Sequence, residues 1–97
     1  MLRLELSRKA DTDLTGILEY GALQFGWERA EAYVRSLDDS FALIARNPHI
    51  GSIHPDIVQR TRSWPHGSHR IYYEANDETL TILAVLHKSM DVPRWIG

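Results

Sequence analysis

The fold is decided in the last third of the chain, by three short segments rich in apolar residues. They are Arg60-Thr-Arg-Ser-Trp-Pro65, Ser68-His-Arg-Ile-Tyr-Tyr73 and Thr79-Leu-Thr-Ile-Leu-Ala-Val-Leu86. β-Branched and aromatic residues recur in these segments, which is typical of strands. Turn-forming residues separate them, with a proline and a glycine at 65–67 and Asn-Asp-Glu at 76–78. Short turns between three such segments predict an antiparallel meander.

The last of these segments is apolar on both faces. Strict alternation would place one set of residues on each face: Leu80, Ile82, Ala84 and Leu86 against Leu83 and Val85. A strand of this kind is covered on both sides, so we expect it to be central in the sheet. Upstream helices can cover only one face, and we therefore expect a partner to help cover the other.

The start of the chain predicts a strand followed by a helix. Leucines alternate with charged residues from position 2 to position 6, which is typical of a half-buried strand with its leucines toward the core. Ser7 is suited to be the N-cap of a helix. Apolar residues then recur at spacings of three and four up to Phe25, and Gly21 within this stripe is expected to pack closely on another element.

A second helix completes a predicted hairpin. Gly26 is suited to end the first helix, and another apolar stripe extends from about Trp27 to Arg46. A break of two or three residues between two such helices predicts an antiparallel pair. We expect an α+β fold of order β-α-α-β-β-β, with the helix hairpin packed on one face of a small antiparallel sheet. Residues 1–97 are expected to form a single domain.

The composition excludes several classes of protein. The 97 residues include no cysteine, which excludes a disulfide scaffold, a thiolate zinc site and a thiol nucleophile. The net charge is −2, and all five histidines lie in the second half of the chain. This balance lacks the basic footprint of a dedicated nucleic-acid binder. No Gly-x-Ser-x-Gly motif is present to form the nucleophile elbow of a hydrolase.

The N-terminal residues do not predict export or membrane insertion. Charged residues at positions 3, 5, 8 and 9 interrupt the apolar start, so we expect no signal peptide. The longest apolar run, Ile82 to Leu86, is far shorter than the roughly 20 residues that span a bilayer. We expect a soluble, cytoplasmic protein that makes no membrane contact.

Histidines and arginines of the sheet region are candidates for chemistry. His66, His69 and His87 do not have the spacing of a standard zinc site, and no carboxylate nearby in sequence completes one. We therefore expect no metal and no cofactor. Metal-free RNA cleavage needs a general acid or base and cations, which His87, Arg62 and Arg70 could supply.

Alternation along the predicted strands also suggests a cationic and aromatic patch on the face away from the helices. Its members would be Arg62, Trp64, Arg70 and Tyr72. Such a patch could bind RNA through charge and stacking. Packing of an arginine stem on an aromatic ring across neighbouring strands would explain the same residues without any function. The residues alone leave both interpretations open.

The sheet region also carries a specific set of motifs. Ser63-Trp-Pro-His-Gly-Ser-His-Arg-Ile-Tyr-Tyr73 is followed by Ile82-Leu-Ala-Val-Leu-His-Lys-Ser-Met-Asp91. This pattern resembles the C-terminal signature of ParE-type toxins, which belong to the RelE/ParE superfamily of type II toxin–antitoxin systems. Trp64 stands where the family usually has phenylalanine. The resemblance covers essentially the whole chain, because upstream motifs also match: Ala10-Asp-x-Asp-Leu14, Phe25-Gly-Trp27 and Asn47-Pro-x-x-Gly51.

The resemblance implies a partner as well as a fold. The partner would be a ParD-like antitoxin, forming a hetero-oligomer in which its flexible C-terminal segment wraps the toxin. The N-terminal part of such antitoxins usually binds operator DNA, so contact between this chain and DNA would be indirect.

Two activities occur among proteins with this resemblance. ParE relatives poison DNA gyrase, whereas RelE relatives cut mRNA at the ribosome with several sheet cations and a C-terminal tyrosine or histidine. In this chain the sheet has only Arg60, Arg62 and Arg70, and His87 lies in the ParE-like context His-x-x-Met-Asp. We therefore expect a non-enzymatic gyrase inhibitor. The alternatives are an mRNA endonuclease of RelE type that uses His87, Arg62 and Arg70, and a non-toxic module that binds the antitoxin to co-repress its operon.

Two contact surfaces are expected on this basis. An apolar groove between the helix hairpin and the sheet would bind the antitoxin through Leu18, Tyr33, Leu37, Trp64, Tyr72 and Trp95. The C-terminal tail would meet the target through Lys88, Met90, Arg94, Trp95 and Ile96.

Overall fold

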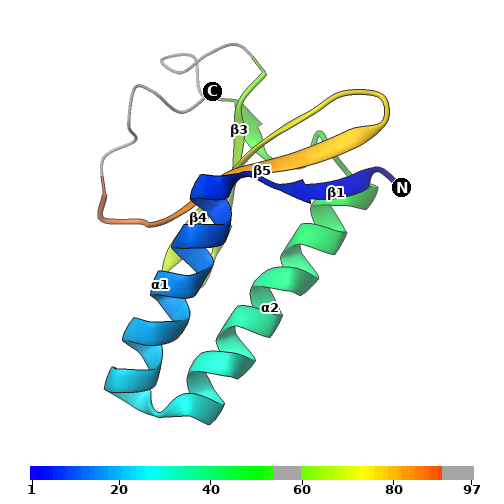
Figure 1. Ribbon diagram of the computed structural model, residues 1–97. Helices are drawn as coiled ribbons and strands as arrows, with labels where there is room; N and C mark the ends of the chain where they lie inside the picture. Colours follow the sequence, from blue (N-terminus) through cyan, green and yellow to red (C-terminus); the bar gives the residue numbers. More distant parts are fainter. Residues whose placement is uncertain (54–59, 91–97) are drawn as a thin grey trace.

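Two helices pack on one side of a five-stranded sheet (Figure 1). The computed structural model describes residues 1–53 and 60–90. The elements in chain order are β1 (Arg3–Leu6), α1 (Arg8–Phe25), α2 (Trp27–Arg46), β2 (Ser52–Ile53), β3 (Arg62–His66), β4 (His69–Ala75) and β5 (Thr79–His87). The predicted α+β fold and the predicted order of its helices and main strands are confirmed.

The sheet has the strand order β1-β5-β4-β3-β2, so β5 is an interior strand as predicted. It differs from the prediction in one pairing, because β1 lies parallel to β5, with Arg3 opposite Thr79 and Leu6 opposite Ile82. The sheet is therefore mixed rather than purely antiparallel. Along the chain, the two helices separate β1 from the other strands, and a connection of that length permits parallel pairing. A second difference is the short strand β2, which the predicted order β-α-α-β-β-β does not contain.

The helix boundaries follow from local chemistry. The side chain of Ser7 accepts a hydrogen bond from the backbone N–H of Ala10 at 3.0 Å, which confirms its role as N-cap. Gly26 alone joins α1 to α2, where we expected a break of two or three residues. Its φ of +90° lies in a region that glycine occupies without a steric penalty, and this allows the shorter connection.

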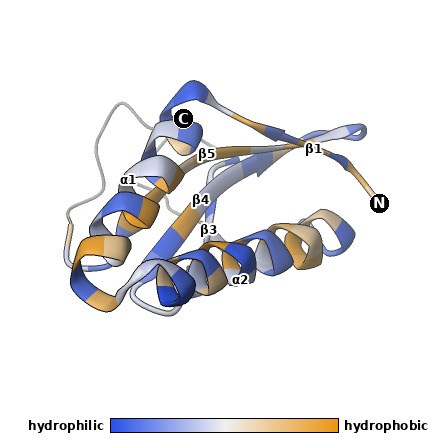
Figure 2. Ribbon diagram, turned by 60° about the horizontal axis from the view of Figure 1, so that its bottom comes forward, coloured by the Kyte–Doolittle hydropathy of each residue, from blue (hydrophilic) through white to orange (hydrophobic). Residues whose placement is uncertain are grey.

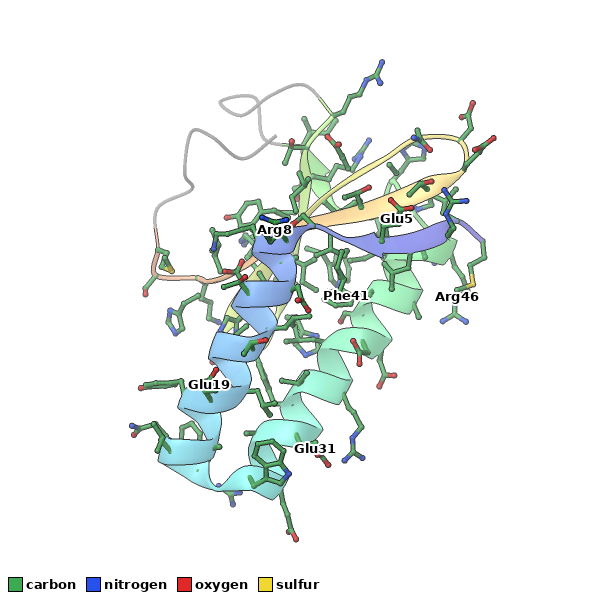
Figure 3. The ribbon with its side chains drawn as sticks, in the orientation of Figure 1. Glu5, Arg8, Glu19, Glu31, Phe41 and Arg46 are labelled. Atoms are coloured by element: carbon green, nitrogen blue, oxygen red, sulfur yellow. The ribbon has the colours of Figure 1, made fainter. Side chains whose placement is uncertain are left out.

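The main core lies between the helices and the sheet. Phe41 lies inside the molecule between α2 and the sheet, whereas Arg46 points away from it (Figure 3). The other buried members come from α1, α2, β4 and β5: Ala10, Leu37, Ile44, Ala45, Ile71, Tyr73, Leu80, Ile82 and Val85. Burial of large apolar side chains such as these is the main favourable term in folding.

The leucines of β1 are less buried than their alternation predicted. Leu2 packs against the core, but Leu4 and Leu6 are exposed. The prediction that all three face the core is wrong. β1 is an edge strand that pairs only with β5, and a strand at an edge lacks the second neighbour that would cover it.

A β-bulge changes the faces of β5. Tyr72 pairs with Ala84 while Tyr73 pairs with Ile82, so Leu83 is an extra residue in β5. As a result Leu83 and Ala84 both pack on the side away from the helices, with Tyr72 and Leu86. The helix side receives Leu80, Ile82 and Val85. The prediction of strict alternation along this strand is therefore wrong from Leu83 onward.

Candidate functional site

An open groove of about 780 Å³ lies between α1, the first half of α2 and the ends of β4 and β5. We call it the hairpin groove and define it by Ile17, Gly21, Phe25, Tyr33, Val85 and His87. Its walls are the two helices, and its floor is formed by the first residue of β4 and the last residues of β5. A largely apolar groove with a few polar groups at one end is typical of a binding site.

The end of the groove near the hairpin connection is exposed and aromatic. Tyr20 and Phe25 line it and are 65% and 63% exposed. Leu23 and Trp27 are exposed in the same region. Figure 2 shows hydrophobic residues in the half of α1 nearest the connection to α2. Contiguous exposed apolar side chains of this size mark a surface that binds another molecule.

The opposite end of the groove holds a cluster of histidines around Tyr33. The hydroxyl of Tyr33 lies 2.7 Å from Nδ1 of His69 and also accepts the backbone N–H of Ser68 at 3.2 Å. A Cβ on Gly67 would lie 2.8 Å from the Tyr33 hydroxyl oxygen, so glycine is required in this turn. Tyr33, which the sequence assigned to the antitoxin surface, thus lines the groove and also fixes the turn between β3 and β4.

His69 and His87 lie opposite each other on β4 and β5, on the helix side of the sheet. Their ring centroids are 5.6 Å apart, with the ring planes at 80°. Burial, reinforced by the nearby His87 and His66, lowers the pKa of His69, and Asp13 opposes this effect. At neutral pH His69 is therefore an uncharged polar group on the floor of the groove.

His66 does not belong to the groove. Its Nε2 lies 2.8 Å from the hydroxyl of Ser36 and its Nδ1 2.6 Å from the hydroxyl of Ser40. Both serines are on α2, so His66 attaches β3 to that helix. In residues 1–53 and 60–90 no group of three or more histidine or acidic side chains is placed to hold a metal ion.

Asp13 closes the groove on the α1 side. One of its carboxylate oxygens accepts the backbone N–H of Val85 at 2.9 Å, and the other forms an ion pair with Lys9. β1 pairs with β5 only as far as Ile82, so the edge of β5 beyond that point meets α1 instead of another strand. Asp13 thus accepts the hydrogen bond of a backbone N–H that an adjacent strand would otherwise have paired.

The three residues expected to support RNA cleavage do not form one site. Arg62 pairs with Tyr73 of β4, whereas His87 of β5 pairs with His69 at the other end of β4. The guanidinium of Arg62 donates to the carbonyl of Gly51 at 2.8 Å. Arg70 donates to the hydroxyl of Ser63 at 3.0 Å. It alternates with His69 and Ile71 along β4, so it lies on the side of the sheet away from the groove.

The expected cationic and aromatic patch is also divided. Trp64 pairs with Ile71 and packs against the core on the helix side. Tyr72 pairs with Ser63 and packs on the opposite side. Directly paired residues share a face of the sheet. Arg62 and Trp64 therefore lie on the helix side with their partners Tyr73 and Ile71, and the prediction that they share a face with Arg70 and Tyr72 required a different register of β3 and β4.

The remaining predicted antitoxin contacts lie in different surroundings. Leu18 is partly buried on α1, and Trp64 is partly buried on the helix side of the sheet. Leu37 is 0% exposed and Tyr72 is 3% exposed, so their side chains are buried within the chain itself. We expected both at a surface, and the core of α2 and the second apolar cluster hold them instead.

The predicted target-binding tail is described only in part. Lys88 and Met90 are exposed beyond β5, and Met90 also lines the groove. Arg94, Trp95 and Ile96 lie outside the described residues.

Sequence reasoning missed Tyr20, Phe25 and His69 as groove residues. Phe25 was assigned to the buried stripe of α1, and Tyr20 was not assigned at all. The available signal was the sequence near the end of α1, where apolar residues occupy more of the helix circumference than one core-facing stripe needs.

Comparison with known proteins agrees with this architecture. The family model described as ParE toxin of the type II toxin–antitoxin system parDE matches residues 4–92. Toxin ParE1 of Caulobacter vibrioides is 33% identical over 92 residues, and Toxin ParE1 of Mycobacterium tuberculosis is 34% identical over 93 residues, with 95% of each chain covered in both cases.

Solved structures show the same fold. The chromosomal ParDE toxin–antitoxin system from P. aeruginosa gives a TM-score of 0.76 at 20% identity, over 90% of this chain and 96% of the other. The toxin–antitoxin complex RelBE2 from Mycobacterium tuberculosis gives 0.64 at 21% identity, over 89% and 96%. No helix among the described residues is both long enough and apolar enough to cross a membrane. The chain therefore belongs to the ParE toxin family of type II toxin–antitoxin systems.

Proposed function

We propose that this chain is a cytoplasmic toxin that inhibits DNA gyrase by binding it, and that a ParD-like antitoxin neutralises it by occupying the hairpin groove. The observation that carries the proposal is the groove itself. Its exposed aromatic end is costly to leave in water unless a partner covers it during part of the protein's life.

The choice of an antitoxin as the occupant rests on the family. Two solved structures with this fold are a ParDE system and a RelBE2 toxin–antitoxin complex. A groove walled by two helices suits an amphipathic helix or an extended segment that buries its apolar side chains. Any contact with operator DNA would be made by the antitoxin.

The preference for binding over cleavage rests on the positions of the cations. Arg62 and Arg70 are held apart from His87, so the groups that would stabilise a cleaved phosphate do not converge on the acid or base. A toxin without such a site can still act by holding its target in an inactive state. Lys88, Met90 and the tail residues Arg94, Trp95 and Ile96 are the proposed gyrase contacts.

A supercoiling assay tests this proposal directly. Purified chain should inhibit gyrase, and addition of the ParD-like antitoxin of the same operon should restore activity. A folded chain that leaves supercoiling unchanged at every molar excess would reject gyrase as the target. Trp95→Ala should lower inhibition more than it lowers thermal stability if the tail makes the contact.

A ribosome-dependent mRNA endonuclease is the second candidate, and one observation favours it. His69 and His87 face each other at 5.6 Å on the groove floor, and two neighbouring histidines can act as acid and base in phosphoryl transfer. Under this alternative His87→Ala should abolish growth arrest while antitoxin affinity is kept. Persistent toxicity of His87→Ala would exclude it, and absence of growth arrest with the unmodified chain would favour a co-repressor module instead.

A further inference from the structure

At the histidine end of the hairpin groove, the Nε2 atoms of His69 and His87 indicate what kind of ligand binds there. Nδ1 of His69 is bonded to the Tyr33 hydroxyl, and Nδ1 of His87 accepts the backbone N–H of Ser89 at 3.1 Å. Each ring is therefore oriented through Nδ1, and within the described residues neither Nε2 has a hydrogen-bond partner. Because Nδ1 of His87 accepts a hydrogen bond, the neutral ring carries its hydrogen on Nε2 and can donate it to an incoming group.

The charged side chains of the groove lining include two cations and one carboxylate. α1 contributes Lys9 and Asp13, and α2 contributes Arg29 and the neutral phenol of Tyr33. Asp13 forms an ion pair with Lys9 and accepts the N–H of Val85, and its charge also acts on His69. His66 approaches from β3, but both of its nitrogens are bonded to serine hydroxyls of α2. The groove lining as a whole therefore carries one more cation than carboxylates, and Asp13 is the one of these three charged side chains that acts on His69.

We propose that the histidine end of the groove receives a carboxylate side chain of the antitoxin segment that occupies the groove, held by the Nε2–H of His87 and by that of His69 once its ring takes up a proton. This inference rests on the proposed antitoxin docking and deepens it. It also fixes the direction of the occupant, because the apolar part of the segment must lie over Phe25 and Tyr20 while its carboxylate lies over His87.

The inference has a thermodynamic consequence. A carboxylate beside an imidazole stabilises its charged form, whereas burial keeps His69 neutral in the free chain. The complex then binds more protons than its separated components, and affinity must rise as the pH falls. Uptake of one proton strengthens binding by up to about tenfold per pH unit.

The test is the pH dependence of the dissociation constant for the ParD-like antitoxin of the same operon, measured by calorimetry between about pH 6 and about pH 8. Buffers of different ionisation enthalpy report the protons taken up. The unmodified chain should bind more tightly at the lower pH. His87→Gln, a change at an exposed residue, should reduce the slope and the proton uptake, and His69→Gln with His87→Gln should remove both. His49→Gln, at an exposed histidine outside the groove, is the matched control and should keep the full slope.

The outcomes separate this inference from the function on which it rests. Tight binding that does not change with pH, or an unchanged slope in His87→Gln, overturns the carboxylate site and leaves antitoxin docking intact. Absence of binding at every pH overturns both. Neutralising each acidic residue of the antitoxin in turn should identify one whose loss abolishes the pH slope, and the inference fails if none does.

Discussion

Gly21 of α1 lies directly against Ala30 of α2, so that a Cβ added to Gly21 would stand 3.0 Å from the Cβ of Ala30. The sequence predicted close packing at this glycine, and the contact confirms it. Gly16 in the same helix offers a contrast, because a Cβ there would meet no atom within 4 Å.

These two glycines make a matched pair for stability measurements. Gly16→Ala should raise the free energy of unfolding by about 0.5–1 kcal/mol, since alanine loses less conformational entropy in a helix. Gly21→Ala should gain less or become destabilising, because the helices must move apart to admit the methyl group. Urea denaturation measures both values, and equal gains would contradict the close contact.

Tyr73 should contribute to stability through its hydroxyl group. The hydroxyl donates to the carbonyl of Pro48 at 2.8 Å and accepts the N–H of Gly51 at 2.9 Å, attaching the residues after α2 to the sheet. Tyr73→Phe leaves the buried N–H of Gly51 without a partner and should cost about 1–3 kcal/mol. Tyr20→Phe, at an exposed position, is the control and should change stability little. Equal effects of the two variants would show that the buried hydrogen bonds contribute nothing.

Asp13 should matter more than its neighbour Asp11 on the same helix. Asp13→Ala removes the acceptor of the Val85 N–H and should lower the free energy of unfolding by about 1–3 kcal/mol. Asp11→Ala removes only a favourable interaction with the helix dipole, worth about 0.3–1 kcal/mol. Hydrogen exchange at the Val85 amide should accelerate in the first variant alone. An unchanged exchange rate would argue against the Asp13 contact.

Stability should fall in mild acid because of His69. Its pKa lies below the ordinary value of 6.5, so the unfolded chain takes up a proton first as the pH falls. The free energy of unfolding should therefore decrease below about pH 6.5 and reach its full loss below the pKa of the folded state. His69→Gln should make this dependence shallower, as measured by urea midpoints at several pH values. A variant with an unchanged pH profile would assign the acid sensitivity to other groups.

Exposed aromatic side chains of the groove should contribute to antitoxin affinity. Phe25→Ser removes a large apolar contact and should weaken binding by about tenfold or more, since burial of such a side chain is worth about 1.5–3 kcal/mol. Ile53→Ser changes a similarly exposed apolar residue on β2, outside the groove, and should leave the affinity unchanged. Equal losses would show that the groove is not the docking site.

Local signals in the sequence were sufficient for the two helices and the three main strands. Ser7 and Gly26 bound α1, and the turn residues around Gly67 separate β3 from β4, because caps and turns depend on neighbours along the chain. The parallel position of β1 could not be predicted this way. Pairing partners are chosen by tertiary packing, and the alternation of Leu4 and Leu6 is equally compatible with either direction.

The candidate site was harder to predict because it depends on register. Whether Trp64 shares a face with Tyr72 is decided by how β3 and β4 align, and no single residue reports that alignment. Likewise the contact of His69 with Tyr33 joins elements more than thirty residues apart along the chain. The apolar character of the groove could have been inferred from α1, but its histidine end could not.

The extra residue in β5 has an evolutionary consequence. Tyr73 already pairs with Ile82 and Tyr72 with Ala84, so loss of the single codon for Leu83 would remove the bulge and leave every other pair of that ladder in place. A codon lost elsewhere in the strand would require its neighbours to find new partners. Deletions that accumulate in this strand over time should therefore concentrate at Leu83, and the histidine at the strand's end would keep its side of the sheet through such changes.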